Sequence, residues 1–176
     1  PGLDYNSPKR FALQLLSAIL GGGVSSRLFQ QVREQQGLCY SIYSYGAGHA
    51  ETGVFCIYTA LNKETEAKAL ATIRRVIDDF LAKGPTTEEL ERAREQQKAN
   101  VIMGLESTQS RMSHAGRSLL FSGEILTPEQ IIDAYDRVTR EDVVALAQEI
   151  FNWEQASLSA VGQVRTAEES RQLVLG

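Results

Sequence analysis

The stretch Leu20–Tyr40 reads L-G-G-G-V-S-S-R-L-F-Q-Q-V-R-E-Q-Q-G-L-C-Y and holds most of the signals that decide the fold. Serines directly after the glycines can start a new helix, because a serine hydroxyl accepts a hydrogen bond from the first free backbone N–H groups. The apolar residues Leu28, Phe29 and Val32 then recur at helical spacing. Gly37 stands where a helix can end in the left-handed conformation, and beyond it the pattern has the period of a strand. The stretch therefore predicts a helix, a glycine stop and a first strand.

Two strands are predicted on the C-terminal side of this helix. Alternating side chains indicate one strand over 38–46 and a second over 53–61, joined by a loop bounded by glycines. Both faces of the resulting hairpin carry apolar groups, so we expect helices to cover at least one of them. Cys39 and Cys56 fall on neighbouring strands, where the register decides whether they meet. We expect two free thiols, which are typical of a cytoplasmic protein.

The rest of the chain is predicted mainly as amphipathic helices, and most of these begin at a capping residue. Before the glycines, Asn6-Ser7-Pro8 resembles a cap followed by proline, and it opens a nearly apolar helix through Leu20. The other predicted elements are a helix from Asn62 to Gly84, one from Thr86 to about Glu106, its continuation over 107–122 with Met112, Ala115, Leu119 and Leu120 facing inward, helices from Thr127 and from Thr139, and a last strand over 156–161.

This order of elements predicts an α+β domain with two layers, an antiparallel or mixed sheet with helices packed on one face. We expect a single domain over residues 1–176, with residues 163–176 as a polar tail. The chain begins Pro1-Gly2 without a Met or a signal-peptide pattern, so we expect it to be a processed piece.

Composition limits the classes of function. The apolar fraction is 43% and the charged fraction 23%, as in soluble globular proteins. The net charge of −4 gives no basic patch for nucleic acid, so no nucleic-acid partner is expected. No apolar run approaches the ~20 residues that span a bilayer, so no membrane partner is expected either.

Three features suggest chemistry but have simpler explanations. The triple glycine lacks the lysine of a phosphate-binding loop, so we interpret it as a tight connection between helices. The acidic residues Glu88, Glu89, Glu91 and Glu95 have no histidine nearby in sequence and are predicted to form a solvated helix face. His49 and His114 belong to no metal-binding motif.

The segment S-S-R-L-F-Q-Q-V-R-E-Q-Q-G-L-C-Y-S-I-Y-S, residues 25–44, closely resembles the second, non-zinc half of the M16 metallopeptidases. This is the family of pitrilysin, insulinase and the mitochondrial processing peptidase, and the resemblance extends from about Tyr5 to Gly162. It implies one repeat of the LuxS/MPP-like metallohydrolase fold. In the family an Arg and a Tyr at this spacing face the zinc site of the other half, and here they are Arg33 and Tyr40. Spacing alone would favour a surface Arg and a half-buried Tyr without a function.

The resemblance also implies what this chain lacks. M16 enzymes carry zinc on an H-x-x-E-H helix with a distant Glu, and this chain has no such motif. We therefore expect no catalytic residue, no metal and no activity in this chain alone, with zinc in a partner domain. The implied function is that of the substrate-binding C-terminal half of a zinc endopeptidase, with Arg33 and Tyr40 holding the peptide.

Several alternatives stay open at this level. The zinc-bearing N-terminal domain could belong to the same chain or to a partner subunit, and a homodimer is also compatible with the sequence. A non-catalytic structural or assembly subunit of the same family is the main alternative function, and an unrelated α+β binding module is a third. Residue patterns do not give the peptide preference, and localisation rests only on the thiols, which favour the cytoplasm.

Overall fold

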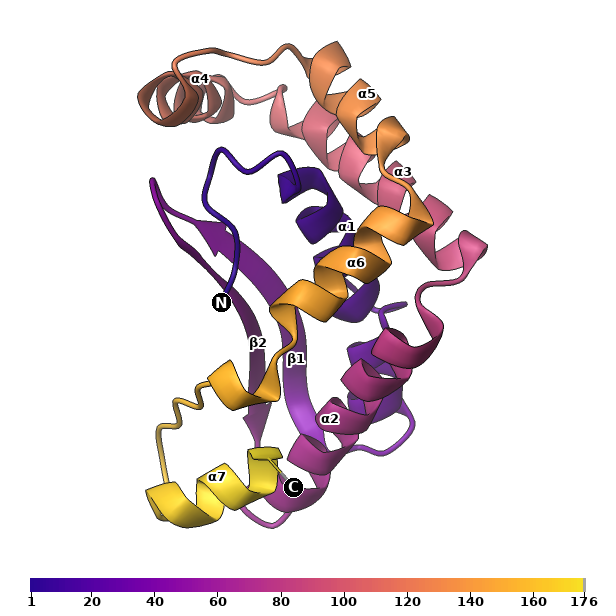
Figure 1. Ribbon diagram of the computed structural model, residues 1–176, viewed down its shortest axis with the longest axis vertical. Coiled ribbons are helices and arrows are strands. Elements are labelled where there is room, and N and C mark those ends of the chain that lie inside the picture. The colour runs from indigo at the N-terminus through magenta and orange to yellow at the C-terminus, as the bar shows by residue number, and fades with distance from the viewer. Residues whose placement is uncertain (176) are drawn as a thin grey trace.

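A long β-hairpin with helices gathered on one side organises the structure (Figure 1). The structure is a computed structural model that describes residues 1–175, with side chains described through residue 174. In chain order the elements are α1 (Arg10–Gly21), η1 (Phe29–Glu34), β1 (Cys39–Gly48), β2 (Gly53–Leu61), α2 (Glu66–Lys83), α3 (Thr87–Gly104), α4 (Thr108–Ser122), α5 (Pro128–Arg137), α6 (Arg140–Ile150), η2 (Trp153–Gln155) and α7 (Ala167–Leu175).

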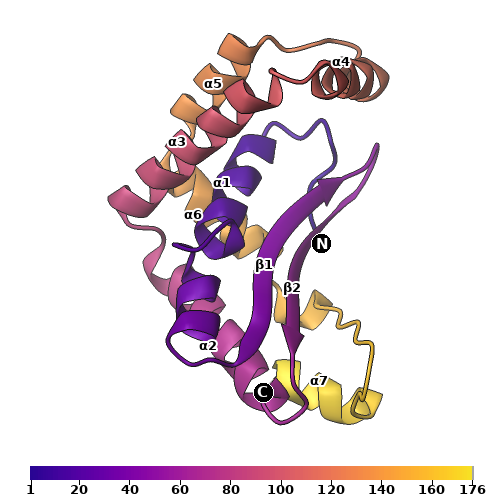
Figure 2. The same ribbon diagram turned by 180° about the vertical axis from the view of Figure 1, so that it is seen from behind.

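The hairpin confirms the predicted antiparallel sheet and the α+β class. β1 and β2 pair from Gly48 opposite Gly53 to Cys39 opposite Leu61, with one irregularity near the start of β1. This register places Cys56 opposite Tyr45, far along the strand from Cys39, and both cysteines are free thiols as predicted. α1, α2, α3, α5 and α6 lie on one side of the hairpin in both Figure 1 and the reverse view of Figure 2, while α4 lies near its loop end and α7 near its opposite end.

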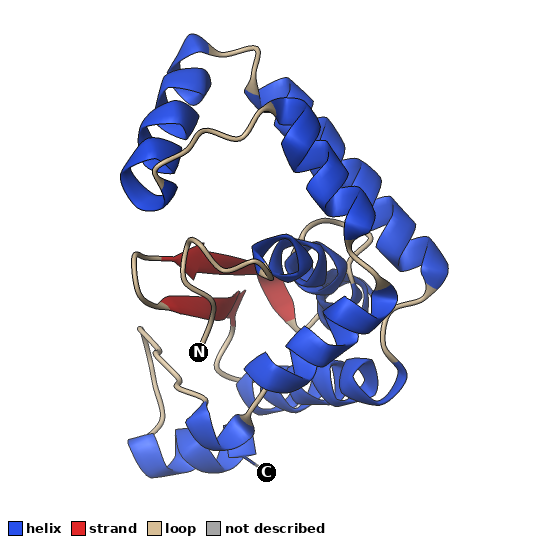
Figure 3. Cartoon of the chain, turned by 45° about the horizontal axis from the view of Figure 1, so that its top comes forward, coloured by secondary structure: helices blue, strands red, loops and turns tan. Residues whose placement is uncertain are grey.

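The predicted third strand over 156–161 is wrong. Figure 3 shows the hairpin as the sheet of the described residues, and 156–161 is drawn as loop. Its apolar side chains are exposed, with Leu158 at 46% and Val161 at 101% of full exposure. A strand is stabilised by a neighbour's backbone, and 156–161 pairs with neither strand of the hairpin, so the alternation of its side chains is insufficient to make it a strand.

The core lies between the hairpin and the outer helices, and α1 fills its centre. Leu15, Leu16 and Leu20 are fully buried there. At Gly21 a Cβ would lie only 2.4 Å from the Ser44 backbone nitrogen, so the glycine permits the close approach of α1 to β1. On the other side of α1 lie α3, α5 and α6.

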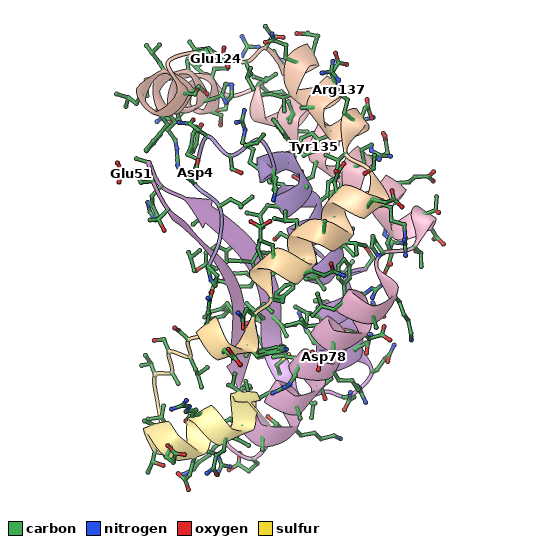
Figure 4. All side chains as sticks on the ribbon, viewed as in Figure 1. Asp4, Glu51, Asp78, Glu124, Tyr135 and Arg137 are labelled. Atoms are coloured by element: carbon green, nitrogen blue, oxygen red, sulfur yellow. The ribbon has the colours of Figure 1, made fainter. Side chains whose placement is uncertain are left out.

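Tyr135 on α5 closes the outer side of this core. Figure 4 labels this side chain where α5 meets the helices beneath it, and its hydroxyl donates a hydrogen bond to Gln14 Oε1. The ring also meets Phe11 edge-on at 5.2 Å between centroids. Burial raises the pKa of Tyr135 to about 12, which keeps the phenol neutral and able to donate throughout the physiological range.

Most predicted helix ends are confirmed, because they depend on residues close in sequence. Capping boxes begin α3, α5 and α6 at Thr86, Thr127 and Thr139. Positive φ angles at Gly37, Gly84 and Gly123 follow η1, α2 and α4.

Two predicted helix starts are wrong by several residues. α1 begins at Arg10 rather than at Ser7-Pro8, since Ser7 accepts the Arg10 N–H in a preceding turn at 3.1 Å. α2 begins at Glu66 with Thr65 before it, because Asn62 forms a turn in which its carbonyl accepts from Thr65. In both places the residue that sequence assigns to the cap begins a turn through its backbone carbonyl, and the helix starts after that turn.

The segment 107–122 also differs from its prediction. It is a separate helix, α4, capped by Ser107, and not a continuation of α3. Met112, Leu119 and Leu120, predicted to face inward, are 61%, 58% and 85% exposed. α4 meets the start of the chain, where Asn6 Nδ2 donates to Phe121 O at 2.6 Å.

The residues 163–176, predicted as a polar tail, include the helix α7 within the described range. Arg165 pairs with Glu66 at 2.7 Å, and Arg74 donates to Val174 O at 2.9 Å. These contacts attach α7 to α2 through charged groups, which explains why hydrophobic periodicity gives little sign of it.

Candidate functional site

Arg33 lies in a helical turn wider than an α-helix. Its element, η1, is π-helical, and the N–H of Gln35 donates to Gln30 O at 2.9 Å across that wider turn. The guanidinium carbon lies 4.7 Å from the Phe29 ring centroid, and the side chain is half-buried. Short π-helical turns recur at functional sites, because the additional residue redirects the side chains that follow.

Tyr40 occupies a second irregularity, at the start of β1. Cys39 pairs with Leu61 and Ser41 pairs with Ala60, so Tyr40 is the additional residue of a β-bulge. Bulges redirect a side chain and are common beside active sites. The ring of Tyr40 is 84% exposed, an unusual position for a large aromatic group in a hairpin.

The turn between these two residues is fixed by backbone contacts. Gly37 has φ of +59°, and its N–H donates to Arg33 O at 2.9 Å. Leu38 N–H donates to Val32 O at 3.0 Å, and both of these apolar side chains are buried. These bonds hold the helical end and the strand start at one backbone corner, with Arg33 and Tyr40 on its two sides.

The structure reverses the burial that spacing alone suggests for this pair. Arg33 is the half-buried residue and Tyr40 the exposed one. Neither side chain is wholly inside the core, and no hydrogen bond joins them in the part of the chain that the structure describes. Their assignment as substrate-binding residues stays a prediction.

The cysteine between them, Cys39, has a thiol that burial keeps protonated. Burial raises the pKa of the Cys39 thiol, while the hydrogen bond with Thr59 and the positive charge of Arg33 act in the opposite direction. A raised thiol pKa leaves little thiolate at neutral pH, and thiolate is the nucleophilic form. The raised pKa therefore disfavours Cys39 as a nucleophile at this site.

Further along the hairpin, three tyrosines form an aromatic surface. Tyr43 stacks on Tyr58 across the strands at 4.9 Å between centroids, and Tyr45 lies 6.1 Å from Tyr43. Each of the three is between 43% and 45% exposed. This aromatic surface lies opposite the face that Ile42 and Ser44 bury against α1, so the sheet has one packed and one open face.

The side chains of residues 1–174 do not form a metal-binding site. Among them, no group of three or more His, Cys, Asp or Glu is placed to hold an ion. His49 lies exposed in the hairpin loop, and His114 lies on α4 with its Nε2 3.3 Å from Leu126 O. No chemical step through a metal can therefore be assigned to these side chains.

The acidic cluster on α3 is only partly the solvated face that sequence predicts. Glu88, Glu91 and Glu95 are exposed, but Glu89 is not. Its carboxylate receives two hydrogen bonds from Arg27, at 2.7 and 2.8 Å. Sequence reasoning missed this pair, because the capping box identifies Glu89 but no local pattern shows that Arg27 reaches it.

A cavity of about 220 Å³ lies elsewhere, between α3, α4 and α5. Val101, Leu105, His114 and Ile131 are among its lining residues, and Arg33 and Tyr40 are not. The candidate site is thus an open surface corner rather than a pocket, and enclosing a ligand there would need a second surface.

Comparison with known proteins identifies the family. The profile of the peptidase M16 inactive domain matches residues 1–97, which include the whole corner from η1 to β2. An uncharacterized zinc protease of Streptomyces coelicolor is 36% identical over 97% of this chain and 37% of its own length. A second, from Bacillus subtilis, is 37% identical over 85% of this chain and 37% of its own length.

Solved structures agree with the sequence matches. The peptidase M16 inactive domain from Pseudomonas fluorescens is 28% identical, with a TM-score of 0.77 over 86% of this chain and 36% of that one. The chain thus spans little more than a third of the proteins that it matches. An unrelated α+β module is excluded, and the chain belongs to the M16 peptidase family, as its inactive, C-terminal type of domain.

Proposed function

We propose that this chain is the substrate-binding half of an M16 zinc endopeptidase and that it holds a peptide against a zinc site on another domain. The observation that carries the proposal is the exposure of Tyr40, 84% in a residue that a β-bulge turns out of the hairpin. A tyrosine with only a packing role would bury its ring, since burial of an aromatic side chain is strongly favourable.

The two side chains would act on the peptide backbone. The phenol of Tyr40 would donate a hydrogen bond to the oxyanion that develops on the scissile carbonyl. Arg33 would offer a planar, permanently charged set of donors to neighbouring carbonyl oxygens. Donors aimed at a developing negative charge stabilise the transition state more than the substrate, so they raise the rate as well as the affinity.

The zinc belongs to another domain in this proposal. The described side chains do not fit a metal, while relatives named zinc proteases are almost three times longer than the matched segment. The partner would be an N-terminal, zinc-bearing M16 domain, in the same chain or in a second subunit. Its surface would enclose the open corner at Arg33 and Tyr40.

The aromatic surface of Tyr43, Tyr45 and Tyr58 would extend the contact with the peptide. An extended peptide lying along the open face of the hairpin would place alternate side chains on these rings. The half-exposed rings provide apolar area at a small cost in conformational entropy, because tyrosine has few rotatable bonds.

The proposal is tested by combining the chain with its zinc-bearing domain and comparing Arg33→Ala and Tyr40→Phe. We expect each variant to lower kcat/KM by about 10²–10³, the usual effect of losing a donor to an oxyanion. Arg75→Ala, an exposed arginine on α2, and Tyr5→Phe, whose ring packs against Phe121 away from the aromatic surface, are the matched controls. Unchanged kcat/KM in both Arg33→Ala and Tyr40→Phe would refute the assignment.

An assembly role is the second candidate, and the exposed apolar side chains of α4 favour it. Met112, Leu119 and Leu120 are more than half exposed on one helix, as in a surface that a partner covers. In a purely structural subunit the partner would still bind, but Arg33→Ala and Tyr40→Phe would leave every activity of the complex unchanged.

A further inference from the structure

Arg27, at the start of the helical segment 27–34 that carries Arg33, has a largely buried side chain. Its side chain is 12% exposed and forms a forked ion pair with Glu89, from Nε to Oε1 at 2.7 Å and from Nη2 to Oε2 at 2.8 Å. Nη2 also donates to Gly84 O at 2.8 Å. Such paired, charge-assisted bonds are both strong and directional, so they fix the position of the group that makes them.

The surroundings of this guanidinium are unusual for an arginine of the surface. Its carbon lies 4.9 Å from the Phe80 ring centroid, and Nη1 lies 3.6 Å from Asp79 Oδ2. Nη1 has no hydrogen-bond partner among the described residues although it is buried. Removing a charge from water in this way is costly, which argues for a specific role rather than incidental packing.

Glu89 joins two elements through one carboxylate. Its Oε2 accepts the Thr86 N–H at 2.8 Å and so closes the cap of α3, while both oxygens bind Arg27. Burial alone would raise the pKa of Glu89, but the hydrogen bonds from Arg27 and Thr86 outweigh it and lower that pKa. The carboxylate is therefore charged at neutral pH, so the ion pair between Glu89 and Arg27 is formed there.

The first turn of the helical segment from Arg27 to Glu34 is also held by Gln30, whose N–H donates to Ser26 O at 3.0 Å and whose Nε2 donates to Val24 O at 2.7 Å, but the pair with Glu89 is its ionic link to α3. Three glycines precede the segment, and Leu28 and Val32 are its fully buried side chains. Its π-helical bonds place Arg33 in a direction different from that of a regular α-helix, since one residue of helix corresponds to about 100° of rotation. A change of register here would turn Arg33 away from the corner that it shares with Tyr40.

We propose that Arg27 is a positioning residue, whose ion pair with Glu89 holds the π-helical turn in register and thereby aims Arg33. The part that concerns the peptide rests on the proposed function, because it uses Arg33 as a substrate-binding residue. The part that concerns the turn stands on the geometry alone.

The turn is tested directly by hydrogen exchange in the 176-residue chain. Arg27→Lys keeps the charge but cannot form the forked pair. We expect exchange of the amides in 29–38 to accelerate by about tenfold, the effect of losing one charge-assisted bond. Glu89→Gln is the second variant, for use if Arg27→Lys does not fold.

Arg140→Lys is the matched control. Arg140 lies on α6 and binds the same turn between α2 and α3, donating to Pro85 O at 2.9 Å and also to Lys83 O. It lies outside the segment 27–34, so its replacement should leave exchange over 29–38 as in the unmodified chain. Equal acceleration in both arginine variants, or none in Arg27→Lys and Glu89→Gln, overturns the proposal.

A double-mutant cycle in the chain combined with its zinc-bearing domain tests the link to Arg33. We expect Arg27→Lys to lower kcat/KM by about tenfold on its own and to cause no further loss in the Arg33→Ala background. Losses that multiply in the double variant would mean that Arg27 acts only on stability. If Arg33→Ala itself has no effect, the proposed function fails, while the exchange measurement still decides the positioning of the turn.

Discussion

Arg27 and Arg33 belong to one short segment, yet their guanidinium groups have opposite environments. The first is buried in a forked pair with Glu89, and the second lies half-exposed over the ring of Phe29. In the sequence, only the family motif marks Arg33 as a candidate site residue, and nothing marks Arg27. The reason is physical: the partner of Arg27 comes from another helix, and such a contact leaves no local pattern.

The ion pair with Glu89 predicts a pH-dependent stability. Because the folded state lowers the pKa of Glu89 from 4.5, its contribution is present above the unfolded pKa and is lost as the pH falls through the lower folded value. In urea unfolding from pH 7 downward, we expect Glu89→Gln to be less stable than the unmodified chain at pH 7. The difference should shrink in acid below pH 4.5.

Glu88→Gln on the same helix is the control for that experiment, because Glu88 is exposed. Its unfolding curve should follow the unmodified chain at every pH. Glu129, Asp142 and Glu169 also have lowered pKa values and stay in place in both variants, so they contribute to the acid sensitivity that remains. A constant gap between Glu89→Gln and the unmodified chain across the whole range contradicts the prediction.

Among the elements, those with local signals were predicted and those with distant partners were not. The threonine caps of α3, α5 and α6 and the glycine ends of α2 and α4 follow from neighbouring residues. The predicted strand over 156–161 fails because pairing depends on residues elsewhere. The prediction that the apolar face of α4 points inward is wrong, because periodicity shows an apolar stripe but not what covers it.

For the candidate site, the sequence supplied Arg33 and Tyr40 but predicted neither the π-helical turn nor the β-bulge.

Gly37 forms the corner between η1 and β1, and replacing it tests how much its left-handed conformation contributes to stability. With φ of +59°, a side chain there would meet its own backbone, although no other atom lies within 4 Å of a Cβ. We expect Gly37→Ala to destabilise the chain by about 1–2 kcal/mol in chemical denaturation. Gly116→Ala, in the interior of α4 with equally open space, should instead be stabilising by roughly 0.5–1 kcal/mol. Similar effects of the two substitutions would show that backbone strain is not the cause.

At the scale of the whole molecule, the packed and open sides differ sharply. α1 and the outer helices bury one face of the hairpin, whereas the aromatic surface on the other face and the apolar residues of α4 remain accessible. No helix among residues 1–175 is long and apolar enough to cross a membrane. In the complete assembly we expect the zinc-bearing domain to cover much of this accessible area.

The apolar side chains of α4 predict self-association of the chain when it is purified alone. We expect sedimentation velocity to show growing dimer content with concentration, because contiguous exposed apolar groups favour burial between copies. Replacing Leu119 and Leu120 together by glutamine should restore a monomer over the same range. The control exchanges the polar residues Gln109 and Ser113 of α4 for alanine, and a monomer in every sample would contradict the prediction.

The bare outer edge of β2 has a practical consequence. At its beginning Gly53 O accepts a backbone hydrogen bond from the N–H of Gly2 at 2.9 Å. The remaining length up to Leu61 offers peptide groups without a neighbouring strand in the described chain. Such an edge can pair with other chains and lead to aggregation. The isolated polypeptide should therefore be kept at low concentration, or a proline should be introduced on the exposed edge of β2.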